Sequence, residues 1–166
     1  MLKVYNGYAK FLGGINKVLD VVCIALMLTK VAAVFYQVIM RQIFDNAPAW
    51  SEESALIMMA WFVYLGIVIG VKEGLHIGIT MLVNRLPKIA QFVIEIIVNL
   101  LILTLAVLLF HFGYSLATFV MANSLPATGL SVSIFYFPVA IAGLLMTLMV
   151  LGKIAEQFVI ARREPQ

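Results

Sequence analysis

The residues that could take part in chemistry are few and widely separated. Charged residues make up 11% of the 166, and the chain has two histidines, His76 and His111, and a single cysteine, Cys23. His76 follows the second long apolar stretch and His111 lies late in the third. About 30 Å of membrane would separate them, so one haem or metal could not bind both. With no nucleophile–base pair, phosphate-binding loop or Cys/His cluster, the sequence predicts no catalytic, cofactor or metal site in this chain.

Glu52 and Glu53 are adjacent, and this adjacency excludes a shared role as acid and base. On a helix, neighbouring side chains point about 100° apart. Two interpretations are open. In the first, the carboxylates lie at the positive end of a helix that Ser51 caps. In the second, one of them pairs with Arg41 or with a residue of a partner chain.

Two spacing patterns in the same region predict helix surfaces suited to contact. A spacing of three to four residues puts one set on a single helix face: Trp50, Glu53, Ile57, Trp61 and Tyr64. Trp50 by itself fits an ordinary membrane-interface position equally well. A second set consists of glycines at every fourth residue: Gly66, Gly70, Gly74 and Gly78. Such a seam lets another helix approach closely, although its last two members also fit a bend.

Lys30 is the most costly residue for a membrane-spanning helix. It lies well inside the first apolar stretch, where a charge costs about 3 kcal/mol on insertion scales. Three explanations are open: the side chain reaches toward the membrane surface, it pairs with Glu95, or it pairs with an acidic group of another subunit. Either pairing implies a polar helix interface and not a substrate site.

The composition of the whole chain places these residues in a membrane. The sequence is 64% hydrophobic with a mean hydropathy of +1.08, and its charged fraction is well below the roughly 25% of soluble domains. Its net charge of +3 is too small and too dispersed to favour nucleic acid. The lipid bilayer is therefore the expected solvent.

Hydropathy predicts an all-α, polytopic fold, with a single membrane domain over residues 1–166. Four transmembrane helices are expected near 18–40, 54–71, 89–116 and 134–160. Before them, residues 1–17 combine lysines with apolar residues at helical spacing, which predicts an amphipathic interfacial helix on the cytoplasmic side. A signal peptide is the alternative, but the apolar run continues to Met40, longer than a signal core needs.

The positions of lysine and arginine predict the orientation in the membrane. Positive residues gather in three places, the N-terminal segment, the connection between the second and third spans, and the C-terminal end: Lys3, Lys10, Lys17, Lys72, Arg85, Lys88, Lys153, Arg162 and Arg163. The other two loops offer only Arg41. Because short cytoplasmic loops are enriched in positive residues, both termini are expected in the cytoplasm.

Several short motifs follow one another in an order that is characteristic of one family. Arg41 closes the first span, Trp50-Ser-Glu-Glu53 opens the second, and Trp61 and Leu65-Gly66 lie within it. After it come Gly74-Leu-His76-Ile77, Leu86-Pro87, the uncharged loop 125–130 and Phe137-Pro138. This order resembles the small membrane subunit (Q-type, DctQ/SiaQ-like) of tripartite ATP-independent periplasmic (TRAP) transporters. Two positions depart from the family pattern: Ser54-Ala55 stands where Ala-Arg is expected, and Thr80 where an acidic residue is common.

The resemblance implies a three-component system of the bacterial inner membrane. A periplasmic substrate-binding protein would capture an organic acid, such as a dicarboxylate or a sialic acid. A large membrane subunit would carry it inward with sodium, and the small subunit would act as its scaffold, without enzymatic activity or a cofactor. The candidate residues for subunit contact or structure are then Lys30, Arg41, Trp50, Glu52, Glu53, Trp61, Gly66, Gly70 and His76. The outer loops near 45–50 and 123–129 would face the binding protein.

Two other functions are compatible with four apolar spans. A membrane anchor of a redox enzyme would suit the helix number, but it needs two histidines at the same depth. A stand-alone homodimeric transporter would need polar groups along a path, and only Lys30 and Glu95 are candidates for lining one. Identifying the proteins that associate with this chain would distinguish the three.

Overall fold

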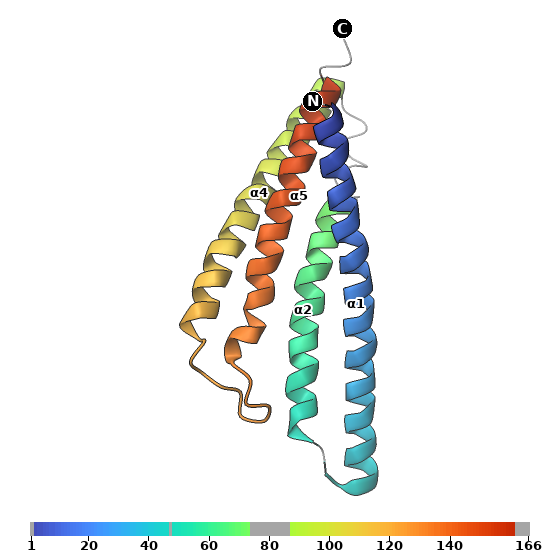
Figure 1. Cartoon of the computed structure of the whole chain (residues 1–166), viewed down its shortest axis with the longest axis vertical. Helices are drawn as coiled ribbons and strands as arrows, with labels where there is room; N and C mark the ends of the chain where they lie inside the picture. The colour runs from blue at the N-terminus through green and yellow to red at the C-terminus, as the bar shows by residue number, and fades with distance from the viewer. Residues whose placement is uncertain (1, 47, 74–86, 162–166) are drawn as a thin grey trace.

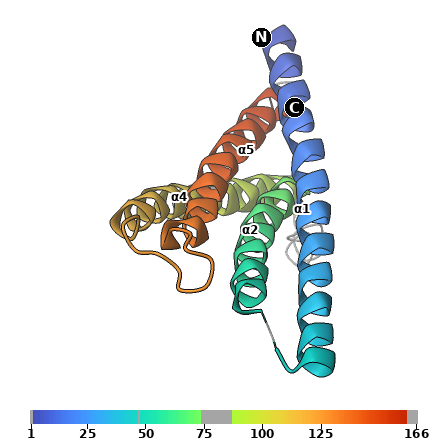
Figure 2. The same ribbon diagram turned by 60° about the horizontal axis from the view of Figure 1, so that its bottom comes forward.

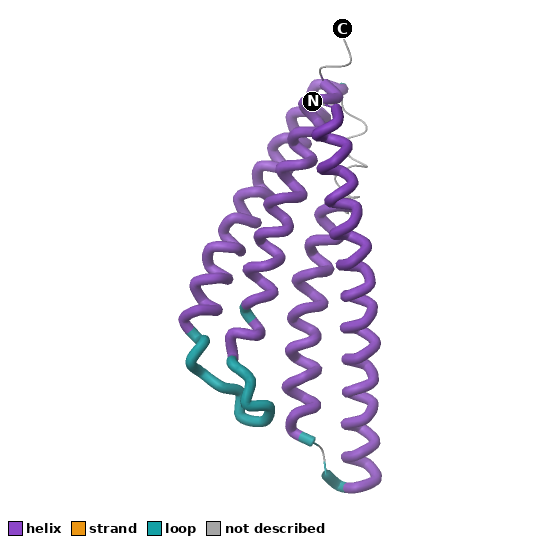
Figure 3. Tube along the Cα trace, in the orientation of Figure 1, coloured by secondary structure: helices purple, strands orange, loops and turns teal. Residues whose placement is uncertain are grey.

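The computed structural model describes residues 2–46, 48–73 and 87–161, and this part of the chain is almost entirely helical (Figure 1, Figure 3). Its elements are α1 (Leu2–Phe44), α2 (Ala49–Glu73), α4 (Lys88–Phe119), the short 3-10 helix η1 (Val132–Phe135) and α5 (Phe137–Ala161). Four stretches are long and apolar enough to cross a membrane: Gly13–Phe44, Ala49–Val71, Ala90–Phe119 and Val132–Ile154. The prediction of an all-α chain with four such spans is confirmed.

The N-terminal segment differs from the prediction of a separate surface helix. Residues 2–17 are the first turns of α1, which is a single helix to Phe44. Neither Gly13 nor Gly14 interrupts it, because isolated glycines within a helix weaken it only modestly. A distinct interfacial helix over residues 1–17 is therefore not seen.

The four long helices form two antiparallel hairpins, α1–α2 and α4–α5, that meet along α2 and α5 (Figure 1). The order across the bundle is α4, α5, α2, α1. The start of α1 and the end of α5 lie at the same end of the molecule, and the two described loops lie at the other (Figure 3). Turning the view shows that α5 approaches α1 only toward its own C-terminal end (Figure 2).

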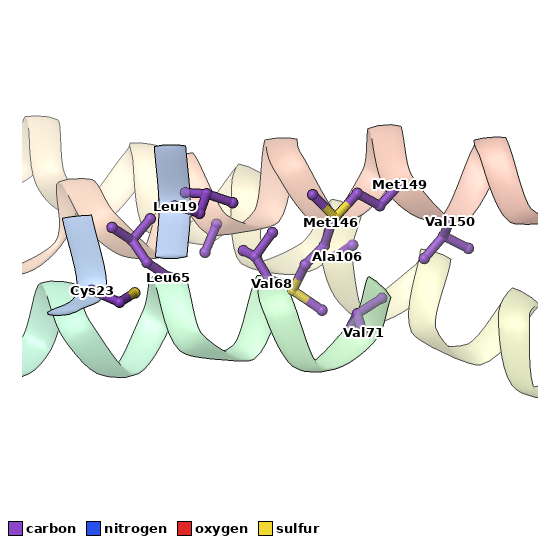
Figure 4. Close-up of a cluster of buried hydrophobic side chains, with 10 residues drawn as sticks. Leu19, Cys23, Leu65, Val68, Val71, Ala106, Met146, Met149 and Val150 are labelled. Carbon is purple, nitrogen blue, oxygen red and sulfur yellow. The ribbon is translucent and has the colours of Figure 1, made fainter. Parts of the chain in front are cut away.

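A cluster of buried apolar side chains joins the two hairpins (Figure 4). All four long helices contribute to it: Leu19, Cys23, Leu65, Val68, Val71, Ala106, Ala142, Met146, Met149 and Val150. Outside this cluster most side chains of α1 and α4 are exposed. Since lipid and partner helices are as apolar as these surfaces, the exposed faces suit a membrane and not water.

The α4–α5 hairpin is held by unusually close backbone contact. A Cβ atom built on Gly143 would lie 2.7 Å from the Ala106 carbonyl oxygen, and one on Gly113 would lie 2.8 Å from the Ala140 backbone nitrogen. Small residues at these positions let the two helix backbones touch. The hairpin therefore has no room for a larger side chain at either glycine.

The α1–α2 hairpin packs in a different way. From residue 15 onward, the residues of α1 that are not fully exposed repeat at intervals of three and four: Ile15, Asn16, Leu19, Cys23, Leu26, Lys30, Ala33, Gln37 and Met40. This spacing is that of a left-handed pair of helices with interlocking side chains. Since α2 is the main neighbour of α1, these residues form the α1 seam, and Lys30 belongs to it.

Candidate functional site

The polar contacts of the described chain concentrate where α2 begins, around the carboxylate of Glu53. This carboxylate accepts three hydrogen bonds from the loop between α4 and α5. The backbone N–H groups of Ala127 and Thr128 donate at 2.9 and 2.8 Å, and the Thr128 hydroxyl donates at 2.8 Å. Bonds to a charged acceptor are the stronger kind of hydrogen bond. Glu53 therefore ties the loop of one hairpin to the first turns of the other.

The loop that Glu53 binds has a definite internal structure. Ser124 and Ser131 form an isolated antiparallel bridge. Within it, Leu125 N–H donates to the Leu130 carbonyl at 2.7 Å and Gly129 N–H donates to the Leu125 carbonyl at 3.0 Å. Gly129 has a φ of +69°, a left-handed conformation that costs glycine little. The uncharged sequence is thus folded into a turn whose N–H groups point at one carboxylate.

The end of this loop is held at η1 by two serines and one tryptophan. The Ser131 hydroxyl donates to the Met121 carbonyl at 2.8 Å and accepts from Ser133 N–H at 3.3 Å, which caps η1. From α2, the Trp61 indole Nε1–H donates to the Ile134 carbonyl at 3.1 Å. Trp61 therefore provides a second link between α2 and the connection to α5, two helical turns from Glu53.

These contacts bear on the prediction that one face of α2 is a surface for contact. Glu53 and Trp61 do share a face, but that face binds the loop and η1 of the same chain. Trp50 lies apart from it, 47% exposed, with its ring 6.0 Å from the ring of Tyr36 on α1. The surface that the spacing predicted for contact is thus largely used within the chain.

The start of α2 also differs from its predicted capping. The helix begins at Ala49, so Ser51 lies inside the first turn. Its hydroxyl donates to the Pro48 carbonyl at 2.6 Å, and so Ser51 does not cap. Glu52 lies in the first turn and is exposed, where a carboxylate interacts favourably with the helix dipole.

The predicted partners of Arg41 and Lys30 within the chain are not found. Among the described residues, Arg41 forms no ion pair with Glu52 or Glu53, because the Glu53 carboxylate is turned to the α4–α5 loop. Lys30 forms no ion pair with Glu95 either, since Lys30 is on α1 and Glu95 on α4, at opposite edges of the bundle. The structure therefore does not contain the Arg41–Glu53 and Lys30–Glu95 pairs, each of which was one of the alternatives that the sequence left open.

The glycine seam predicted on α2 makes no close helix contact within the described chain at Gly66. Among the described residues, nothing from another helix lies within 4 Å of a Cβ built on Gly66, so no described helix packs closely against that position. Gly70 is half-buried one turn later. Gly74, Gly78 and His76 lie outside the described residues. The close glycine contacts belong to α4 and α5 instead, a pairing that the spacing of Ala106, Gly113 and Ala117 opposite Ala140 and Gly143 could have suggested.

Lys153 makes a contact at the other end of the bundle that sequence reasoning missed. Its ammonium group, on α5, donates to the Val71 carbonyl at 2.6 Å, in the last turn of α2. The final carbonyls of a helix lack partners and carry partial negative charge, so a lysine is favourable there. Sequence reasoning assigned Lys153 only to the positive charge of a cytoplasmic end.

The remaining titratable groups do not assemble a reaction centre in the described part of the chain. No three His, Cys, Asp or Glu residues there are placed to hold a metal ion. His111 is exposed on α4, with its ring 5.3 Å from that of Phe112, and Cys23 is a buried free thiol. The polar contacts described above hold the two helical hairpins together and leave their outer faces exposed.

Comparison with known proteins decides the family. Residues 30–159 match the model of the family described as tripartite ATP-independent periplasmic transporters, DctQ component. The chain belongs to this family. It is a small permease subunit of a TRAP transporter, a multi-pass membrane protein and not an enzyme.

Three relatives illustrate the range of the match. A putative TRAP transporter small permease protein of Haemophilus influenzae is 29% identical over 140 residues, covering 84% of this chain and 87% of that protein. The sialic acid TRAP transporter small permease protein SiaQ of Vibrio cholerae is 24% identical over 140 residues, covering 84% and 81%. The sialic acid TRAP transporter permease protein SiaT of Haemophilus influenzae is 29% identical over 112 residues, which are 68% of this chain but 17% of SiaT.

Proposed function

We propose that this TRAP small permease subunit is the scaffold on which a large transport subunit is held in the membrane. The transporter would take up an organic acid, such as a dicarboxylate or a sialic acid, with sodium as the coupling ion. Sodium and substrate would bind the large subunit. The small subunit would contribute a rigid surface and no transport step.

The observation that carries this proposal is the partial match to SiaT. Only 17% of that permease aligns with this chain, so its similar segment is joined to a much longer remainder in one polypeptide. Segments that occur fused in one protein and separate in another generally act together. This supports a large membrane partner for the present chain.

The exposed helix faces support the same interpretation. Along α1 and α4, large apolar side chains remain exposed in the isolated chain. In a bilayer these faces can contact either lipid or another subunit, and van der Waals packing against a partner helix is then favourable. The two hairpins, tied together by Glu53 and Trp61, would present these faces at a fixed angle.

The proposed orientation puts both termini in the cytoplasm and the loop end in the periplasm, in the bacterial inner membrane. Its support is the charge distribution of the sequence, together with the placement of the start of α1 and the end of α5 at one end (Figure 1). On this orientation the loop folded around Glu53 and the turn before α2 would face the periplasmic binding protein. The hydrogen bonds that hold the α4–α5 loop in place would suit a docking surface.

The test is purification of this chain from its native membrane in mild detergent, with identification of the associated proteins. We expect a much larger polytopic permease in stoichiometric amount. Reconstituted together, the two should take up an organic acid only with an inward sodium gradient and the binding protein. A haem- or flavin-bearing partner would contradict the proposal and favour a redox anchor, and uptake by this chain alone would contradict the scaffold role.

A further inference from the structure

Lys30 lies near the middle of the apolar part of α1. It is the only charged residue between Asp20 and Arg41, ten residues from the first and eleven from the second. At the rise of an α-helix this places it about 15 Å from either charge. A lysine side chain extends about 6 Å, so its ammonium group does not reach the level of Asp20 or Arg41 along the helix.

The position of Lys30 on the helix circumference is at the border between covered and uncovered surface. It belongs to the α1 seam, with Leu26 and Ala33 on the side that α2 covers. On its other side lie Met27 and Val34, which are 48% and 39% exposed. The half-buried Lys30 therefore adjoins an apolar strip, Met27 and Val34, that the described helices of this bundle leave exposed.

None of the described carboxylates of the chain neutralises this charge. Asp20 on α1 and Asp45 just after it lie beyond reach along the chain, and Glu52 is exposed in the first turn of α2 and forms no ion pair with Lys30. Glu53 is bound to the α4–α5 loop, and Glu95 is on the far edge of the bundle. Within the described residues Lys30 has neither an ion pair nor a hydrogen bond. A lysine held inside a membrane typically faces a protein partner that supplies an opposite charge.

We propose that Lys30 forms an ion pair with a carboxylate on a membrane-spanning helix of the large transport subunit, which packs along Met27, Lys30 and Val34 of α1. This inference rests on the proposed function and deepens it by naming the contact surface and the chemistry of the partner. The apolar strip gives the helix its packing surface. The ammonium group specifies which helix binds, because a helix without a carboxylate at that depth would leave the charge unpaired.

The first test compares Lys30→Met with Lys30→Arg in the native complex. Methionine keeps the length and the apolar stem of lysine but removes the charge. We expect Lys30→Met to weaken association with the large subunit about 30-fold, mainly through faster dissociation, because it leaves the partner carboxylate unpaired. Lys30→Arg keeps the charge and should retain association within about threefold.

Two readouts separate the loss of an interface from the loss of folding. Since Lys30→Met removes a charge from the membrane interior, the amount of variant chain in the membrane should equal or exceed that of wild type. Lys17→Met is the matched control, because Lys17 is exposed nearer the end of the same helix, and it should bind the large subunit normally. Reversing the charge with Lys30→Glu should abolish assembly. A single Asp or Glu→Lys change in a membrane helix of the large subunit should then restore it.

The outcomes distinguish this inference from the proposed function. If wild type recovers a large permease and Lys30→Met recovers it equally well, the ion pair is wrong while the scaffold role stands. If wild type recovers no large permease, both are overturned. If Lys30→Met instead disperses a homodimer, the carboxylate belongs to a second copy and the inference is overturned.

Discussion

The two helical hairpins of this subunit are held together by different means. In α4–α5 the backbones touch at Gly113 and Gly143, so close backbone contact holds this pair. In α1–α2 side chains interlock along the α1 seam, and that seam contains a lysine without an ion pair among the described residues. The comparison teaches that small residues join one hairpin, whereas the seam of the other accommodates a charged side chain.

The largest effect is expected when a leucine replaces a glycine at the close contact between α4 and α5. Gly143→Leu would place its Cβ 2.7 Å from the Ala106 carbonyl and should separate α4 from α5, lowering the free energy of unfolding by about 3 kcal/mol or more. Gly66→Leu is the control, because open space surrounds that position, and it should change the stability of the isolated chain by less than about 0.5 kcal/mol. Thermal unfolding in detergent measures both. Equal losses would contradict the assignment of the close contact to α4–α5.

The next test breaks the main link between the hairpins. Glu53→Ala leaves the N–H groups of Ala127 and Thr128 without their acceptor, and we expect a loss of stability that is smaller than at Gly143. Glu53→Gln keeps one acceptor oxygen and should lose less. Glu52→Ala removes an exposed neighbouring carboxylate and serves as control, with an expected change within about 0.5 kcal/mol. Protease susceptibility of loop 123–131 should rise in Glu53→Ala alone. An unchanged susceptibility would show that the Ser124–Ser131 bridge and the turn at Gly129 hold the loop without Glu53.

A smaller effect is expected at the second link. Trp61→Phe keeps the aromatic packing but removes the Nε1–H that donates to Ile134, and should cost about 1 kcal/mol. Trp50→Phe is the matched change at an exposed ring and should be nearly neutral. Chemical unfolding followed by far-ultraviolet circular dichroism gives both values. A loss at Trp50 as large as at Trp61 would remove the distinction between a ring that links hairpins and a ring on their surface.

The smallest effect is expected where α5 meets the end of α2. Lys153→Met removes the ammonium group that donates to the Val71 carbonyl, at an expected cost of about 0.5–1 kcal/mol. Lys153→Arg should recover most of it, since a guanidinium can donate to the same carbonyl. Hydrogen exchange of amides near residues 68–71 reports the local effect. Protection that stays the same in Lys153→Met would mean that this lysine does not hold the helix end.

Most of the fold could be predicted from sequence because hydropathy, the dominant signal in a membrane chain, is local. The second span is the instructive exception. Its helix starts at Ala49, five residues before the predicted 54. The prediction was late because a search for apolar residues excludes Glu52 and Glu53, although the start of a helix tolerates carboxylates. The fourth span was predicted to start near 134, and α5 starts at Phe137 with Pro138 in its first turn, where the missing N–H of proline costs no hydrogen bond.

The site was less predictable because its contacts are long-range and use backbone groups. Glu53 was one of the candidate residues, but two of its donors are main-chain N–H groups of an uncharged loop, which cannot be recognised from residue type. Opposite charge suggested Arg41 and Glu95 as partners, yet charge says nothing about which helices are neighbours. The glycines of α2 formed a regular pattern, whereas the pair that mattered, Gly113 and Gly143, lies on two different helices and required the register between them.

The contact between Glu53 and Ala127 also sets an order of events during synthesis. The two residues are 74 positions apart in the chain, and at about 5–20 residues per second the ribosome needs about 4–15 s to pass from one to the other. Through that interval the newly inserted first hairpin carries a carboxylate whose final donors do not yet exist. Water at the membrane surface must solvate this carboxylate until the second hairpin is inserted. The α4–α5 loop therefore joins the two hairpins only after both are in the membrane.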